Sequence, residues 1–116
     1  MSEVRMRQRV RGLAVVVLLS LALTAGCSRD PNVRKLKYLQ SGQRYEASGN
    51  YRAAALQFLN ALKVDSNYGA AHYEMAKVYL KMNDPSLAYS ELMKTVQDSP
   101  SNLKARIDLG NLLVAG

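Results

Sequence analysis

The chain carries two kinds of hydrophobic pattern, one continuous and one periodic. Residues 13–23 read LAVVVLLSLAL and include a single polar residue, Ser20. At about 1.5 Å per residue, a helix of this length is too short for a hydrocarbon core of about 30 Å. From residue 35 onward, apolar residues recur every three or four positions, which is typical of amphipathic helices. The pattern therefore predicts an all-α protein behind a short apolar leader.

Short turn signals divide the periodic region into helices. The segments ASGNY, MNDPS and DSPSN each interrupt the helical pattern. In MNDPS, Asp84 is expected to cap a helix that opens with Pro85, because proline at the first helical position gives up no hydrogen bond. Asp30 and Pro31 form the same pair ahead of the first periodic helix. Three helices are therefore expected between Pro31 and the MNDPS break, and two after it.

The periodic region repeats itself with a period of 34 residues, since residues 35–68 align with residues 69–102. A third copy begins at Leu103 and reaches Gly116 after one helix. At several positions the first two copies share a small or a bulky residue. The small pairs are Gly42 with Ala76 and Ala54 with Ala88, and the bulky pairs are Tyr45 with Tyr79 and Phe58 with Leu92. A repeat of this length predicts stacked helical pairs that share one continuous core.

These residues resemble the tetratricopeptide repeat, in which small residues sit where two antiparallel helices cross and bulky residues fill the space beside them. The small positions here are Gly42, Ala54, Ala61, Ala76 and Ala88. The bulky positions are Tyr38, Tyr45, Phe58, Met75, Tyr79 and Leu92. The sequence departs from the family at Ser66, Thr95, His72 and Arg106. The resemblance implies a right-handed α-solenoid over residues 35–116; a generic helical hairpin is the alternative.

The first thirty residues have the layout of an export signal. Four arginines between residues 5 and 11 precede the apolar run, and small residues follow it. This order is typical of a secretory signal peptide. The sequence Leu23-Thr24-Ala25-Gly26-Cys27 resembles the lipobox of bacterial lipoproteins, although Thr24 stands where the family most often has leucine.

The lipoprotein resemblance gives a role to Cys27, the only cysteine in the chain. It implies cleavage before Cys27, a thioether-linked diacylglycerol on its sulfur and a further acyl chain such as palmitate. Residues 1–26 would then be the signal peptide and residues 27–34 a lipidated tether. Ser28 follows the cysteine, which resembles an address to the outer membrane, facing the periplasm. The alternative is a signal-anchor helix with an incidental cysteine.

The net charge of +7 is unevenly distributed along the chain. Residues 1–37 carry eight basic and two acidic groups, whereas residues 38–116 carry eight basic and seven acidic groups. Proteins that bind nucleic acid carry a basic face on the folded domain itself. The nearly balanced charge of the repeat region therefore argues against a nucleic-acid partner.

The sequence offers little catalytic chemistry. One cysteine and one histidine cannot form a zinc site of the finger type, and His72 falls at a packing position of the repeat. Glu46, Glu74 and Glu91 lie on separate expected helices, so solvated surface is their simplest interpretation. We expect no enzyme activity, no metal and no cofactor other than the lipid on Cys27.

The tetratricopeptide resemblance implies a concave groove lined by the first helix of each copy, which would bind a protein segment. Carried over by register, the groove residues are Leu39, Gln43, Tyr73, Lys77, Leu80, Lys81, Lys104 and Ile107. This mixture of apolar and basic side chains suits an amphipathic partner with some acidic character. The carboxylate clamp of chaperone-binding members is not reproduced in the sequence.

Together these features predict a membrane-anchored scaffold for protein assembly in the cell envelope. The stretch from Lys37 to Ala76 resembles repeat lipoproteins of exopolysaccharide export and surface-protein sorting. The alternatives are a lipoprotein of type IV pilus or outer-membrane-protein assembly, an accessory subunit that positions an envelope enzyme, and a truncated fragment of a longer protein.

Overall fold

The computed structural model describes the backbone of residues 2–27 and 30–116 and the side chains of residues 3–16 and 30–116. These residues form α-helices and include no strand. The helices are α1 (Ser2–Cys27), α2 (Pro31–Ala47), α3 (Tyr51–Val64), α4 (Gly69–Lys81), α5 (Pro85–Asp98) and α6 (Leu103–Ala115). The prediction of an all-helical chain is thus confirmed for the described residues. Internal contacts divide the chain into Met1–Val33 and Arg34–Gly116, which are considered separately.

Helix α1 runs without interruption through the arginine-rich start and the apolar run. Its described side chains, which include Val4, Met6 and Val10, are exposed. Among the described residues, none of the helices combines the length and the apolar character needed to cross a membrane. The side chain of Cys27 and those of the small residues before it lie outside the described residues. The signal peptide and the lipidated cysteine therefore stay predictions.

Local side-chain caps explain where most of the helices begin. The backbone N–H of Asn32 donates to Asp30 Oδ1 at 2.9 Å, and that of Leu87 donates to Asp84 Oδ1 at 3.1 Å. Helices α3 and α6 are capped in the same way by Asn50 and Asn102. Such a cap satisfies a backbone donor that has no partner within the helix. The two predicted aspartate caps are confirmed.

The start of α2 alters one predicted boundary. The expected tether includes residues 31–34, but these residues belong to α2, which begins at Pro31. The physical reason is local, because Asp30 caps the helix and Pro31 has the backbone angle that a first helical residue needs.

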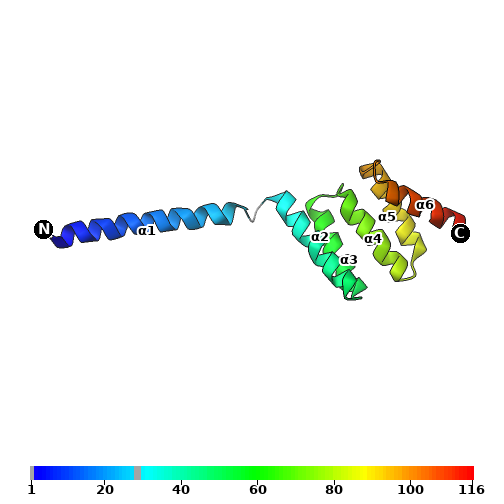
Figure 1. The fold of residues 1–116 in the computed structure, drawn as a ribbon, viewed down its shortest axis with the longest axis horizontal. Coiled ribbons are helices and arrows are strands. Elements are labelled where there is room, and N and C mark those ends of the chain that lie inside the picture. Colours follow the sequence, from blue (N-terminus) through cyan, green and yellow to red (C-terminus); the bar gives the residue numbers. More distant parts are fainter. Residues whose placement is uncertain (1, 28–29) are drawn as a thin grey trace. The chain divides into compact units, whose positions relative to one another are not determined.

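Helices α2 to α6 follow one another as hairpins in which neighbouring helices run in roughly opposite directions (Figure 1). Helix α4 packs against both α3 and α5, and α5 also packs against α6. The turn between α2 and α3 uses Gly49 at a φ of 78°, and the turn after α4 uses Asn83 at a φ of 60°. Residues with positive φ end helices readily when they are glycine or asparagine. This packing of adjacent pairs is compatible with a helical repeat.

The core consists of two clusters that succeed each other along the row of helices. The first core cluster joins α2, α3 and α4 through Leu39, Ala54, Phe58, Ala61, Ala71, Met75 and Val78. The second core cluster joins α4, α5 and α6 through Ala76, Leu92 and Ala105. Helix α4 contributes to both clusters, so each pair of helices is stabilised by the next pair rather than by itself alone.

The closest packing in the first cluster is at Gly42. A Cβ added to this residue would lie 2.6 Å from Phe58 Cδ1, which is closer than real Cβ atoms approach. Phe58 is fully buried and fills the space over the glycine. Tyr45, expected from the repeat pattern to fill space in the core, is instead 40% exposed beside Arg44 and Ser48. That prediction is wrong, because the Tyr45 side chain is not among those that pack against the first core cluster.

We predict that Gly42→Ala destabilises the protein although alanine favours helices. The steric overlap with the Phe58 ring should cost about 1–3 kcal/mol, which exceeds the helix-propensity gain of up to about 1 kcal/mol. Gly110→Ala is the matched control, because Gly110 lies within α6 and a Cβ added there would meet no atom within 4 Å. The control should keep or raise stability. Chemical denaturation followed by circular dichroism measures both, and equal midpoints would refute the proposed contact.

Candidate interaction surface

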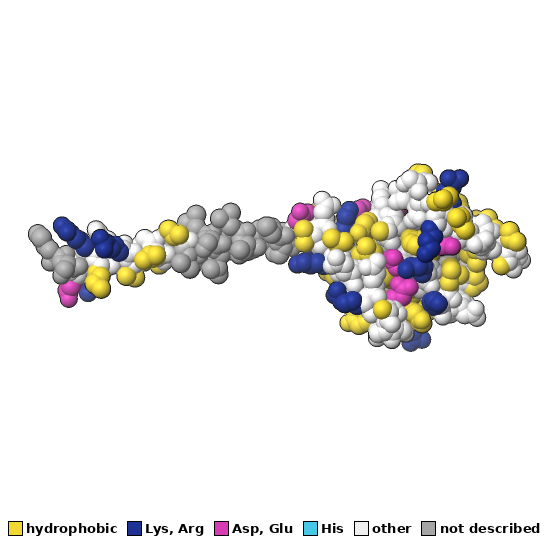
Figure 2. Space-filling model, in the orientation of Figure 1, with side chains coloured by type: hydrophobic (Ala, Val, Ile, Leu, Met, Phe, Trp, Pro, Cys, Tyr) yellow, Lys and Arg dark blue, Asp and Glu magenta, His cyan; other side chains and the backbone are white. Residues whose placement is uncertain are grey.

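A network of charged side chains joins α2 to α4. The Lys77 ammonium lies 2.6 Å from Glu74 Oε2 and 3.6 Å from Glu46 Oε1. Gln43 Nε2 donates to Glu74 Oε1 at 3.3 Å. Acidic and basic side chains lie close together over the middle of the helical domain on the face that Figure 2 shows. The network therefore holds two helices together through residues about 31 positions apart in sequence.

The environment of this network shifts the pKa of two of its members. Burial raises the pKa of Glu46 above its usual value; Lys77 acts against that shift, and the neighbouring Glu74 adds to it. For Lys77, burial alone would lower the pKa, but Glu74 and Glu46 together raise it. Lys77 is thus firmly held as a cation between two carboxyl groups. The two carboxyl groups largely balance the charge of Lys77, so this charge contributes little to the attraction of a partner.

A second set of polar contacts joins α4 to α6. The Tyr73 hydroxyl donates to Asp108 Oδ2 at 2.8 Å. Burial raises the pKa of Tyr73, and the hydrogen bond to Asp108 raises it further. The ammonium groups of Lys77 and Lys104 lie 5.8 and 6.0 Å from the centroid of the Tyr73 ring. At these distances a cation is attracted to the face of an aromatic ring.

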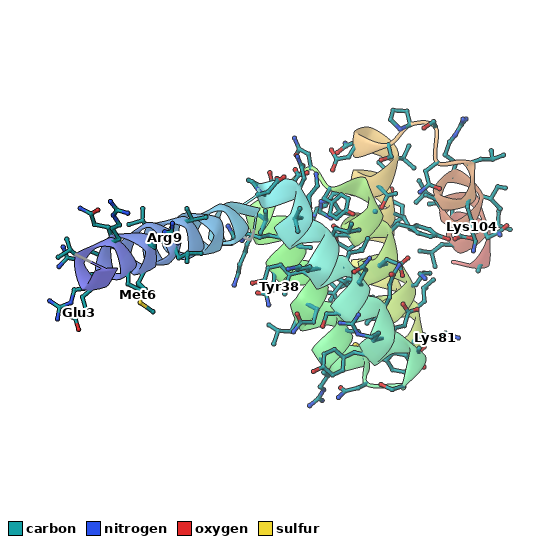
Figure 3. The ribbon with its side chains drawn as sticks, turned by 60° about the vertical axis from the view of Figure 1, so that its left-hand side comes forward. Glu3, Met6, Arg9, Tyr38, Lys81 and Lys104 are labelled. Atoms are coloured by element: carbon teal, nitrogen blue, oxygen red, sulfur yellow. The ribbon has the colours of Figure 1, made fainter. Side chains whose placement is uncertain are left out.

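The two networks lie on one surface formed by α2, α4 and α6, which we call the inner face. Its network residues are Gln43, Glu46, Tyr73, Glu74, Lys77, Lys104 and Asp108. Beside α2 and α4 this face has an open hollow of about 420 Å³. Its lining residues are Gln43, Glu46, Ala47, Tyr51, Glu74, Lys77 and Lys81. Figure 3 marks Lys81 toward the end of α4 and Lys104 near the start of α6.

The structure brings most of the predicted groove residues to the inner face. Four of them take part in the networks, namely Gln43, Tyr73, Lys77 and Lys104. Lys81 lines the hollow, and Leu80 and Ile107 are exposed to solvent. Leu39 is the exception, since it is only 7% exposed and belongs to the first core cluster. It supports the face from below instead of lining it.

Two acidic partners on the inner face, Glu74 and Asp108, are absent from the groove predicted from the sequence. Glu74 and Asp108 each accept a hydrogen bond from a neighbouring helix of the face. They stand 34 residues apart, which is one repeat period, so the recurrence of an acid at the same register is the signal that could have found them. The interpretation of Glu46 and Glu74 as freely solvated residues on separate helices is wrong, because the repeat places those helices side by side.

Glu91, for which the sequence also predicts a solvated position, is 7% exposed and forms a buried pair with His72. His72 Nδ1 lies 2.6 Å from Glu91 Oε2, and His72 Nε2 lies 3.0 Å from the backbone carbonyl oxygen of Ser66. Since a carbonyl oxygen only accepts, the Nε2–H group of His72 donates to Ser66. The prediction for Glu91 is therefore wrong.

The buried pair ties three parts of the chain together: α4 through His72, α5 through Glu91, and the α3–α4 turn through Ser66. Lys94 Nζ donates to the other carboxyl oxygen of Glu91 at 3.0 Å. The fully buried Thr95 hydroxyl donates to the Glu91 backbone oxygen at 2.8 Å. The polar groups around this pair are thus well satisfied, which is the condition for tolerating them in a core.

A comparison of this chain with models of protein families gives no match, and a comparison with characterised proteins finds no significant similarity.

We predict that breaking the His72–Glu91 pair is more damaging than removing it. His72→Phe or Glu91→Leu alone leaves one buried polar partner uncompensated, which costs about 3–5 kcal/mol for a buried pair. The double variant removes both groups and should lose clearly less stability than the sum of the single changes. Urea denaturation of the four proteins measures the coupling. Additive losses would show that the two side chains do not stabilise each other.

Proposed function

We propose that this protein is a tetratricopeptide-type scaffold that binds a segment of another protein on its inner face. The adjacent helical pairs, the 34-residue period and the small residues at helix crossings support the assignment to this repeat class. The observation that carries the proposal is the direct contact of α2 with α4 and of α4 with α6, through Lys77 and Tyr73. Repeat arrays bind their partners on such a continuous face of successive first helices.

The composition of the inner face supports an amphipathic partner segment. Leu80 is 44% exposed and Ile107 is 52% exposed, so both offer apolar area to a partner. Lys81 and Lys104 are exposed cations, while the charge of Lys77 is balanced by Glu46 and Glu74. The preference for acidic groups in the partner therefore rests on Lys81 and Lys104.

The leader supports a location of this scaffold in the cell envelope. We infer that Cys27 becomes the lipidated first residue of the mature protein and that the repeat domain faces the periplasm, at the outer membrane. The support is the position of the only cysteine, directly after Ala25-Gly26 and the apolar run. Assembly or export of exopolysaccharide or surface proteins is the process that we propose; pilus or outer-membrane-protein assembly is the alternative within the same class.

We predict that charges on the inner face abolish partner capture. Leu80→Glu combined with Ile107→Glu replaces exposed apolar side chains, so the fold should persist while partner recovery after mild crosslinking in the native cells falls at least about tenfold. The matched control is Leu87→Glu with Leu56→Glu, since these residues on α5 and α3 are 44% and 54% exposed. Mass spectrometry of the tagged protein measures recovery. Equal losses in both variants would refute the inner face as the binding site.

We predict that Cys27→Ser removes the protein from the membrane fraction. Lipid attachment requires the thiol, and a protein held by acyl chains leaves the membrane when they are absent. Metabolic labelling with an alkyne fatty acid and fractionation of the cells measure the two effects together. A Cys27→Ser protein that stays in the membrane without label would show that the leader is an uncleaved signal anchor.

A further inference from the structure

Helix α2 has a basic side that faces away from the core. Arg34, Lys37 and Arg44 are exposed and follow one another at intervals of three and seven residues, which places them on one side of the helix. Lys37 and Arg44 each stand two positions from a buried residue of α2, Leu39 and Gly42, which is a rotation of about 200°. We call Arg34, Lys37 and Arg44 the basic stripe. Figure 2 shows Lys and Arg side chains on the part of the helical domain that α2 forms.

No carboxylate of α2 balances the charge of the basic stripe. The only acidic residue of this helix is Glu46, which lies beside Lys77 on the inner face. The fourth cation of α2, Lys35, is bonded to Asp65 at 2.6 Å. None of the ion pairs among the described residues includes a residue of the stripe. The stripe therefore presents three positive charges to whatever lies beside it.

The side chains next to the stripe fit the chemistry of a lipid headgroup. A small hollow of about 290 Å³ is lined by Ser41, Arg44, Tyr45 and Ser48. A guanidinium group donates parallel hydrogen bonds to the oxygens of a phosphate, and hydroxyl groups beside it add further donors. Tyr45 is 40% exposed, and a tyrosine with an apolar ring and a polar tip is typical of the boundary between lipid and water.

The proposed lipid on Cys27 would keep the basic stripe near a membrane. Only three residues, 28–30, separate Cys27 from Pro31, the first residue of α2. A chain spans at most about 3.6 Å per residue, so the lipid would hold the start of α2 within about 15 Å. Arg34 lies in the first turn of this helix and is therefore held close to the headgroups.

We propose that the basic stripe of α2 binds anionic phospholipid headgroups of the membrane that holds the anchor, a contact that rests on the proposed acylation of Cys27. A basic surface adds electrostatic attraction to the hold of acyl chains. Gln43 and Glu46 lie on a different side of α2 from the stripe, because successive residues of a helix are about 100° apart. The inner face therefore stays open to a partner while the stripe contacts lipid.

The test measures how fast the Lys37 amine reacts with a water-soluble acetylating reagent, with mass spectrometry to resolve each lysine. The tagged protein is purified from the native cells in detergent and reconstituted into vesicles. One set contains phosphatidylcholine alone, and the other contains equal parts of phosphatidylcholine and phosphatidylglycerol. Lys37 should react at least about fivefold more slowly on the anionic vesicles, because headgroups cover its amine. Lys94 and Lys104 are exposed on α5 and α6, and their rates should change less than about twofold.

A charge reversal that leaves Lys37 in place as the probe tests the role of the stripe. Arg34→Glu combined with Arg44→Glu should remove the protection of Lys37, and the fold should persist because both arginines are exposed. The matched control changes the net charge by the same amount at exposed positions of α5 and α6, through Gln97→Glu, Arg106→Glu and Asn111→Glu. This control should keep the protection of Lys37. Circular dichroism checks that both variants are folded.

Equal rates at Lys37 on the two kinds of vesicle would overturn the proposal, and so would protection that the stripe variant retains. Protection of Lys37 in intact cells but not on the vesicles would also overturn it and assign the stripe to an acidic polypeptide. The intact mass of the same sample reports the acylation of Cys27. An acylated protein without protection would refute the lipid contact alone, whereas a protein without acyl chains would refute the anchor and the contact together.

Discussion

The close approach of helices at small residues is the constraint on which the rest of this structure depends. Gly42 leaves room for the ring of Phe58, and Ala76 lies in one cluster with Leu92. A larger side chain at either position would separate the two helices, and the clusters on both sides of α4 would lose their packing. Because each pair of helices is buried against the next, a local change in one crossing is expected to weaken the whole row.

The same stacking brings polar residues together that are far apart in sequence. Lys77 meets Glu46, and Tyr73 meets Asp108, because one helix of each pair lies beside its counterpart in the next. The pair of His72 and Glu91 instead connects the two helices within a repeat. Polar contacts therefore lie both on the inner face and in the interior. In the interior, hydrogen bonds have fixed directions, so they specify the register of the helices more closely than apolar packing alone.

The inner face of the helical domain combines several kinds of side chain. The inner face combines a balanced charge network with exposed Leu80 and Ile107, which suits a segment recognised by shape and mixed polarity. On α6, Arg106 and Gly110 are exposed, although they stand one period after the buried His72 and Ala76. The inner face follows from the 34-residue period, which places one helix of each pair beside its counterpart in the next.

The sequence by itself determined the helices, their caps and the crossing positions, because these depend on residues within four positions of one another or on their recurrence along the chain. Asp30, Asp84 and Gly42 are recognisable from pattern alone. Only the tertiary structure decided that Tyr45 is exposed and that Glu91 is buried beside His72. The burial of Glu91 depends on His72, which lies 19 positions away on another helix, and periodicity alone does not show which side chains of two helices meet.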